Sequence, residues 1–289
     1  MINEKNRSRY LNILSKIVTY FVLTLGAAII IIPFYVIIIT SVKTYRESGN
    51  TSFTWWPKEG FNFDGYYQVL FKSNGGTSVL KGFINTIWMT VPPTLIGLFI
   101  SALSAYAYAK INFKGKKLFF SLQMMTMMLP SVITLTSSYV LFDLIGWIDT
   151  PFPILIPGMF GGIGLIFFLT QYLKGIPNEI TEAAEIDGAN HMQIFTKLII
   201  PMSGPALFAQ TIIVFISRYN AYLGPLLYLQ SPELYTLQIA LRFYVGLNIS
   251  NWPVIMAGSV VATLPLLIIY IFAQNKIIEG VQMTSGLKA

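Results

Sequence analysis

Long stretches without a charged residue constrain the fold of this chain more than any other feature. Five uncharged runs are long enough to supply the roughly 20 residues that an α-helix needs to cross a bilayer, and a sixth is interrupted only by Arg218. The six runs cover residues 17–42, 82–109, 118–142, 150–173, 198–232 and 243–275. We therefore predict an all-α integral membrane protein with six transmembrane helices.

The overall composition supports a single membrane domain. The 289 residues are 54% hydrophobic and 11% charged, whereas aqueous domains carry about a quarter charged residues. Six spans account for most of the chain and leave no room for a separate soluble domain. We predict one transmembrane domain over 1–289, with a polar segment at 174–204. The predicted spans are about 17–40, 83–109, 118–142, 152–173, 205–228 and 253–274.

The placement of basic residues predicts the topology. Four basic residues precede the first span and four more crowd the short connection between the second and third spans. With both connections on the cytoplasmic side, the inner side holds twelve basic residues and the outer side six. We therefore expect a multi-pass protein of the cytoplasmic membrane, with both termini and segment 174–204 in the cytoplasm. The net charge of +7 is then explained by basic residues on the cytoplasmic side of the membrane, so we expect membrane lipid and not nucleic acid as a partner.

Several kinds of chemistry have no residues to support them. The chain has no cysteine, and it has no G-x-x-x-x-G-K-[ST] sequence that would cradle a nucleotide phosphate. His191 is the single histidine and lies in the polar segment, so no metal site or Ser–His relay is expected inside the membrane. The first apolar run has no small-residue cleavage site at its end, and we expect it to be a retained span. We predict no catalytic residue and no metal.

Prolines and glycines interrupt the predicted spans. Pro130 breaks the methionine-rich third span, and the fourth span contains Gly158 and Gly162 in a G-x-x-x-G pair. Such a pair is a common helix-contact motif in membranes. These interruptions are expected to allow kinks and sliding contacts between helices.

The polar segment around 177–205 reads as a helix, a tight turn and a second helix. Pro177 can begin the first helix, and Gly188 supplies the left-handed conformation that ends it. Asn190 followed three residues later by Gln193 is a plausible capping pair for the second helix, which we expect Pro201 to end. Small residues give this element a surface that another backbone can approach closely.

The same segment resembles a known signature. Glu182, Ala183 and Ala184 are followed by Gly188 and, after nine residues, by Leu198-x-Ile-Pro. This pattern resembles the EAA motif in permease subunits of ABC importers. Asp187 before the glycine is similar to the carbohydrate branch, which includes the maltose-type permeases. The resemblance extends over nearly the whole chain, from the first span to the tail.

The resemblance implies a fold, a function and partners. It implies the type I ABC importer permease fold with a cytoplasmic coupling helix, and half of a pathway for a carbohydrate. The implied partners are a second homologous permease, an ATPase dimer docking at 177–201 and an extracytoplasmic sugar-binding protein. No cofactor is expected on this chain, because ATP and Mg²⁺ would be bound by the ATPase. The implied coupling residues are Glu182, Ala183, Ala184, Asp187 and Gly188.

Arg218 is the one charge inside a predicted span. A central charge costs about 2.5–3.5 kcal/mol unless it faces a cavity or a partner. One interpretation is that Arg218 packs against a partner permease or reaches outward. The other is that Arg218, Tyr219, Asn220 and Tyr222 line the substrate pathway, where an arginine would suit an acidic saccharide. Many carbohydrate permeases have Trp-Asn and an acidic residue here, so this patch departs from the family pattern.

Other functions stay open at this stage. The chain could be an ABC permease for another polar solute, such as glycerol phosphate. It could also be a membrane scaffold without transport activity, or a membrane enzyme that acts without partners. We expect a transport subunit that is not itself an enzyme.

Overall fold

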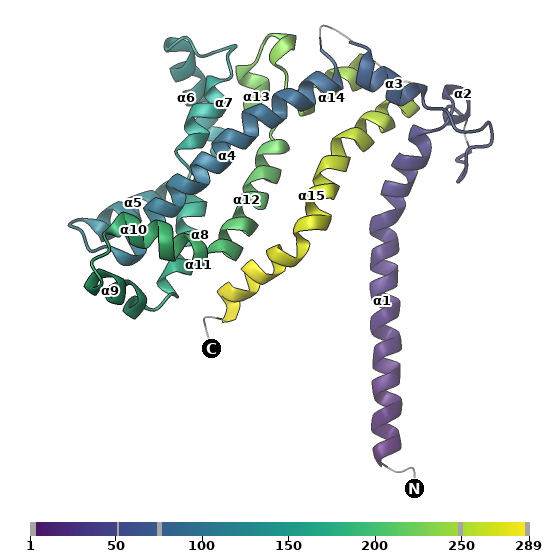
Figure 1. The fold of residues 1–289 in the computed structure, drawn as a ribbon. Helices are drawn as coiled ribbons and strands as arrows, with labels where there is room; N and C mark the ends of the chain where they lie inside the picture. The colour runs from purple at the N-terminus through teal and green to yellow at the C-terminus, as the bar shows by residue number, and fades with distance from the viewer. Residues whose placement is uncertain (1–3, 51, 74–76, 248–250, 287–289) are drawn as a thin grey trace. The chain divides into compact units, whose positions relative to one another are not determined.

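The computed structural model describes residues 4–50, 52–73, 77–247 and 251–286, and the regular elements within these ranges are helices (Figure 1). The chain divides into two compact units. The first comprises the chain through Lys72 together with Val245–Val261. The second comprises Ser73–Tyr244 together with the chain from Ala262 onward.

Helix α1, Glu4–Ser41, dominates the first unit and contains the predicted first span. In residues 12–41 the mean hydropathy of the most apolar 18-residue window is 2.8, yet only 6% of that window is buried. A helix that is apolar on all sides needs an apolar surrounding on all sides. The first unit itself therefore leaves α1 almost uncovered, as expected of a helix that spans a membrane.

The loop after α1 is built around a buried carboxylate. The loop contains two short helices, α2, Tyr45–Ser48, which carries this carboxylate, and α3, Asp64–Phe71. Glu47 is 5% exposed and accepts hydrogen bonds from the Thr54 hydroxyl at 2.6 Å and the Lys58 amide at 3.0 Å. Burial acts to raise the pKa of Glu47, but these hydrogen bonds outweigh it and the pKa is lowered. The loop therefore has a defined shape.

Helix α4, Val79–Lys110, is the central helix of the second unit, and α7, α8 and α12 pack against it (Figure 1). The Ser78 hydroxyl accepts from the Lys81 amide at 3.2 Å and caps its start. Small residues on α4 allow close approach, and a Cβ added at Gly97 would lie 2.5 Å from the Gly158 carbonyl. Packing of this kind replaces the hydrophobic effect, which does not drive helix association in lipid.

The predicted third span is divided into two helices. Helix α5 covers Lys116–Thr126 and α6 covers Ser131–Leu144, with Pro130 at the N-terminal cap of α6. The predicted break at Pro130 is thus confirmed. Between the two helices the amides of Met127, Met128 and Leu129 each donate to the carbonyl three residues earlier, which forms a tight turn before Pro130.

The predicted fourth span is also broken. Helix α7, Phe152–Met159, and α8, Ile163–Lys174, are separated at Gly161, whose φ is +85°. Of the G-x-x-x-G pair, Gly158 lies in a close contact, whereas a Cβ added at Gly162 would meet nothing within 4 Å. The pair therefore marks a helix break with one contact glycine, rather than a continuous contact face.

The remaining helices lie within the polar segment or after it. They are α9 Asn178–Ile186, α10 His191–Ile194, the π-helical turn η1 Phe195–Ile199, α11 Ile200–Met202, α12 Gly204–Tyr219, α13 Leu223–Tyr228, the 3₁₀ turn η2 Pro232–Leu234, α14 Leu237–Leu247 and α15 Trp252–Gly286. The predicted fifth span, 205–228, thus comprises α12 and α13 with a break between them. The predicted sixth span lies within α15.

The number of spans is not settled by helix length alone. Among the described residues, four segments are long and apolar enough to cross a membrane: Asn12–Ser41, Val79–Lys110, Phe152–Lys174 and Trp252–Asn275. The pair His191–Met202 and Gly204–Tyr219, bent by 78°, makes a fifth if it counts as one span. The number six stays a prediction, because the third span consists of two shorter helices.

Asp149 links two loops of the second unit. Its carboxylate accepts hydrogen bonds from the amides of Gln230 at 2.9 Å and Ser231 at 2.7 Å, and from the Ser231 hydroxyl. Its own amide donates to the Tyr228 carbonyl at 2.8 Å. The Ser231 hydroxyl and amide lower the pKa of Asp149, against a smaller opposing effect of burial, and the Gln230 amide adds to the lowering. The connection between α6 and α7 is thereby fixed to the segment after α13.

We expect this link to be lost in acid. A carboxyl group whose pKa is lowered on folding stabilises the fold above its unfolded pKa and loses that contribution as pH falls through the folded value. The ordinary value here is 3.8 and the folded value is lower, so the stabilisation should be complete at neutral pH, begin to decline below about pH 4 and be lost as pH falls through the folded pKa. Asp149→Asn keeps a residue that tolerates φ of 57° and removes the charge.

Hydrogen exchange of the Gln230 and Ser231 amides tests this expectation. The substitution should accelerate exchange at pH 7 by about tenfold, the effect of losing about 1.4 kcal/mol. Exposed Asp143, which makes none of these bonds, provides the matched control Asp143→Asn. Equal exchange in wild type and Asp149→Asn would show that the carboxylate does not hold the loops.

Candidate functional site: the turn at Gly188 and the Arg218 contact

The polar segment begins with an anchored helix. Pro177 precedes α9, as predicted, and Thr181 is the buried residue of this helix. Lys110, the last residue of α4, donates from its ammonium group to the Asn178 side chain at 2.8 Å and also to the Ile176 carbonyl. The start of α9 is therefore tied to the end of the central helix.

The turn after α9 has the predicted geometry. Gly188 has φ of +83°, and the Ala189 amide donates back to the Ala184 carbonyl at 2.9 Å. Asn190 and Gln193 form a reciprocal capping box, with both hydrogen bonds at 2.9 Å. The predicted end of α9 at Gly188 and the predicted capping pair are confirmed.

The predicted end of the second helix at Pro201 is wrong. The helix continues through Pro201 to Met202 and ends at Ser203. The reason is the π-helical turn η1, in which the Ile200 amide donates to the carbonyl of Phe195, five residues earlier. A wider turn of this kind accommodates a proline that cannot donate a hydrogen bond. Pro201 therefore marks a local distortion.

The predicted coupling residues lie together on this turn. Glu182, Ala183, Asp187 and Gly188 are exposed, whereas Ala184 is half-buried against the core of the second unit. The turn and the following helix border a hollow of about 400 Å³, lined by Asp187, Gly188, Lys197 and five neighbours. Exposed small residues beside a hollow form a surface on which another chain can seat.

Ile186 is a residue that the sequence reasoning missed. Its side chain is 86% exposed at the end of α9, the highest exposure of any large hydrophobic residue in the described chain. Ile180 and Ile186 were visible in the sequence as the two large apolar residues of what is now α9. Only the structure reveals that Ile186 points away from the fold. The Ile186 side chain is therefore accessible to another chain that seats on the turn.

The polar segment connects directly to the helix that carries Arg218. The helix ending at Met202 and helix α12 meet at an angle of 78°, with Ser203 buried between them. Phe195 and Ile199 of the segment are buried against Leu169 and Leu173 of α8. The polar segment and α12 are therefore joined through a short, packed bend.

Arg218 is half-buried near the end of α12 and contacts the break in the fourth span. Its Nη2 donates to the Gly158 carbonyl at 2.9 Å. A Cβ added at Gly158 would lie 2.1 Å from Nη1 of Arg218 and 2.8 Å from Cβ of Pro93. Glycine is thus the residue that allows the guanidinium group to reach the backbone at the end of α7. Carbonyls in the last turn of a helix attract cations.

The other three predicted pathway residues have different environments. Tyr219 is 1% exposed, and its hydroxyl donates to the Ala262 carbonyl at 3.0 Å, so its ring is not available to stack on a sugar in this conformation. Asn220 is exposed and donates to the Ile216 carbonyl at 3.0 Å. Tyr222 is half-buried against the cluster around Met89. Of the four, Tyr219 is thus closed off, whereas Arg218 and Tyr222 are half-buried and Asn220 is exposed.

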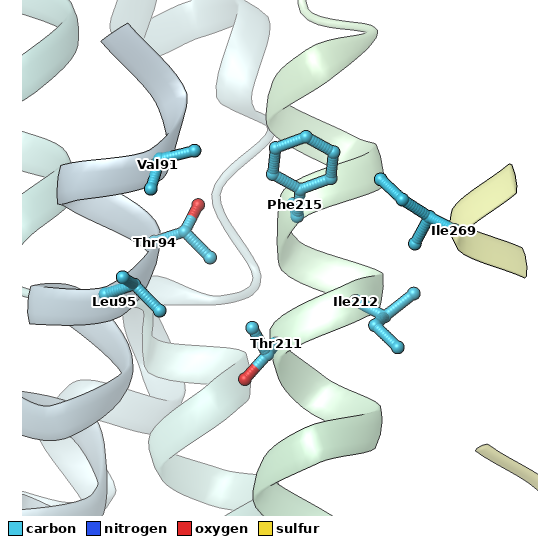
Figure 2. A pocket seen from close by; sticks show the side chains of 7 residues that line it. All are labelled: Val91, Thr94, Leu95, Thr211, Ile212, Phe215 and Ile269. Atoms are coloured by element: carbon cyan, nitrogen blue, oxygen red, sulfur yellow. The ribbon is translucent and has the colours of Figure 1, made fainter. Parts of the chain in front are cut away.

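Two cavities border α12, and the sequence predicted neither. One, of about 240 Å³, is apolar and lies between α4 and α12, with Ile269 of α15 at its side (Figure 2). Within it the Thr94 hydroxyl has no hydrogen-bond partner, whereas that of Thr211 donates to its own helix. The other, of about 220 Å³, is lined by Arg218 and by residues of α4, α7 and α13.

The close contact at Gly158 predicts the effect of adding one methyl group there. Gly158→Ala should displace Arg218 and lower the free energy of unfolding by about 1–3 kcal/mol, as overpacking does. Gly162→Ala is the matched control, because its Cβ would meet nothing within 4 Å. Thermal unfolding of the purified protein, followed by tryptophan fluorescence, measures both. A midpoint for Gly158→Ala no lower than that of Gly162→Ala would contradict the contact.

Comparison with known proteins gives the family. Residues 97–278 match the family described as binding-protein-dependent transport system inner membrane component. The arabinooligosaccharides transport system permease protein AraQ of Halalkalibacterium halodurans is 32% identical over 206 residues, covering 71% of this chain and 73% of that protein. The maltodextrin transport system permease protein MdxG of Bacillus subtilis is 30% identical over 276 residues, covering 94% and 96%.

A solved structure gives the same fold. A chain of a bacterial ABC transporter involved in the import of the acidic polysaccharide alginate matches with a TM-score of 0.80 and 24% sequence identity. The match covers 95% of this chain and 98% of that chain. The predicted ABC importer permease fold is therefore confirmed, and the protein described here belongs to the family of inner membrane components of binding-protein-dependent transport systems.

Proposed function

We propose that this chain forms half of the translocation pathway of an ATP-driven importer for a carbohydrate. The observation that carries the proposal is similarity along almost the whole chain to a maltodextrin permease, with 94% of this chain covered. Further relatives are named for arabinooligosaccharides, trehalose and maltose, and lactose. The names of these relatives share a carbohydrate as the transported substrate.

The proposed partners follow from what the chain lacks and what it exposes. The sequence contains no nucleotide-binding loop, so ATP and Mg²⁺ belong to a separate ATPase. The turn from α9 to α10 is the proposed docking surface for that ATPase, with Glu182, Ala183, Ala184, Asp187 and Gly188 as its contacts. A second permease completes the pathway, and it is a suitable cover for the exposed apolar surface of α1.

Coupling would proceed through the bend at Ser203. An ATPase that closes on ATP displaces α9 and the turn at Gly188. Because Phe195 and Ile199 are packed on α8, this displacement reaches both the fourth and the fifth span. The break near Gly158 and the bend before α12 are the positions where the backbone can hinge. The chain thus converts hydrolysis on another subunit into movement of its own spans.

The exposed Ile186 provides a test of the proposed ATPase contact. Ile186→Ser should leave the fold intact, because the side chain is 86% exposed. Removing an apolar side chain that is buried on docking costs about 1.5–3 kcal/mol, so binding of the ATPase should weaken by about tenfold or more. Co-purification of the ATPase and stimulated ATP hydrolysis measure the effect.

A matched control lies at the opposite end of the second unit. Leu144 at the end of α6 is 79% exposed, and Leu144→Ser removes a similar apolar side chain away from the turn. This variant should retain the ATPase. If Ile186→Ser also retains the ATPase and full ATP-driven uptake of carbohydrate, the proposed docking surface is wrong.

The proposed topology can be read from single cysteines, because the natural chain has none. Lys58 and Lys114 are both exposed and lie in loops proposed to face opposite sides. Lys58→Cys should react with a membrane-impermeant maleimide in intact cells. Lys114→Cys should react only after the membrane is opened. If Lys114→Cys reacts in intact cells and Lys58→Cys reacts only after the membrane is opened, the topology is the reverse of the one proposed.

A further inference from the structure

We infer that the cavity beside Arg218 binds the carboxylate group of an acidic sugar, so that the imported carbohydrate contains a uronic acid unit. This inference rests on the proposed carbohydrate import and names the chemical class of the substrate. We define the Arg218 cavity as the hollow of about 220 Å³ lined by Thr86, Met89, Thr90, Pro153, Ile154, Arg218, Ala221, Gly224, Pro225, Tyr228 and Thr236.

Arg218 has hydrogen-bond donors to spare. A guanidinium group carries five N–H donors and is always charged. In the structure one of them is accepted by the Gly158 carbonyl, a neutral group. Within the described part of the chain, no carboxylate lies within 4.0 Å of Arg218. A cation in a membrane protein that is held only by a backbone carbonyl is therefore available to pair with an anion from elsewhere.

Thr236 gives a second and independent indication. Its side chain is 5% exposed, and its hydroxyl has no hydrogen-bond partner. An unsatisfied buried hydroxyl costs about 1–3 kcal/mol, so such groups are normally paired. Thr236 lines the same cavity as Arg218 but comes from the segment before α14. Helix α12 and the segment before α14 thus each bring an unused donor to the same hollow.

The other polar groups of the cavity are already engaged. Thr86 and Thr90 donate to carbonyls of their own helix at 2.9 and 2.7 Å. The Tyr228 hydroxyl is hydrogen-bonded to Ser138. The remaining lining residues are apolar or glycine, and none of the lining residues is acidic. The available recognition groups are therefore one cation and one hydroxyl, which suit an anion.

The charge balance favours a carboxylate over a phosphate. A carboxylate carries one negative charge and neutralises one guanidinium group. A phosphate monoester carries about −1.5 to −2 at pH 7 and would leave excess charge in an apolar enclosure. The walls formed by Met89, Pro153, Ile154 and Pro225 make that excess unfavourable. The cavity is also more than ten times the 10–15 Å³ that one water molecule needs, so it can hold a solute group.

Equilibrium binding to the assembled transporter in nanodiscs tests the inference without the binding protein. The probes are digalacturonate, its neutral counterpart galactobiose, and glycerol 3-phosphate. Each is measured on the nucleotide-free and on the vanadate-trapped complex, because the pathway opens to different sides in these states. In at least one state the wild type should bind digalacturonate about tenfold or more tightly than either other probe.

Four variants locate the binding group. Arg218→Gln should abolish the preference for digalacturonate, and Arg218→Lys should retain part of it, because lysine keeps the charge but not the fork of donors. Thr236→Val should weaken digalacturonate binding about two- to tenfold and leave galactobiose unchanged. Arg242→Gln is the matched control, because Arg242 is exposed on α14 and lies outside the cavity.

Specific results would overturn the inference. A wild-type complex that binds galactobiose or glycerol 3-phosphate as tightly as digalacturonate lacks the carboxylate site, as would be the case if a partner's carboxylate occupied Arg218. Equal losses for acidic and neutral probes in Arg218→Gln would indicate a purely structural role. The wild-type comparison and Thr236→Val decide the matter even if Arg218→Gln does not assemble. Failure of the Ile186 test would remove the docking surface and leave this binding result unaffected.

Discussion

The second unit depends on how it satisfies backbone groups where its membrane helices are interrupted. Lipid offers no hydrogen bonds, so every interruption must be repaired by protein. At the break between α7 and α8, the Ser101 hydroxyl of α4 accepts from the Gly162 amide at 3.3 Å, and Arg218 of α12 donates to the Gly158 carbonyl. Because the repairs come from both neighbouring helices, the break also fixes how these helices pack.

This repair links the break to the polar segment. Arg218 lies on α12, and one residue, Ser203, separates α12 from the helix that follows the turn at Gly188. In the proposed coupling, a movement of the turn would therefore shift the group that holds the end of α7. The glycines at this break lie close to their neighbours, because an added Cβ would lie 2.1 Å from Nη1 of Arg218 at Gly158 and 2.2 Å from the Ser101 hydroxyl at Gly161. The contacts that pack the break are thus also those through which the proposed movement would pass.

Most of the predictions from the sequence rested on the segregation of charged residues and on residues that favour turns and helix caps. The spans followed from uncharged runs, and the turn followed from Gly188 and from the pair Asn190 and Gln193. The continuation of the helix through Pro201 was not predictable, because the π-helical turn depends on the packing of Phe195 and Ile199. The burial of Tyr219 was equally hidden, since only tertiary structure determines which face of a helix meets α15.

The choice of arginine at 218 follows from these constraints. A lysine would present one compact charge and could satisfy the Gly158 carbonyl or an anion, but not both with defined geometry. The guanidinium group can donate to the backbone through one nitrogen while its other donors stay free. A group that is anchored on one side and unsatisfied on the other holds its charge at a fixed position in an apolar enclosure. Such preorganisation strengthens binding, because the cost of ordering the charge is met on folding rather than when the ligand arrives.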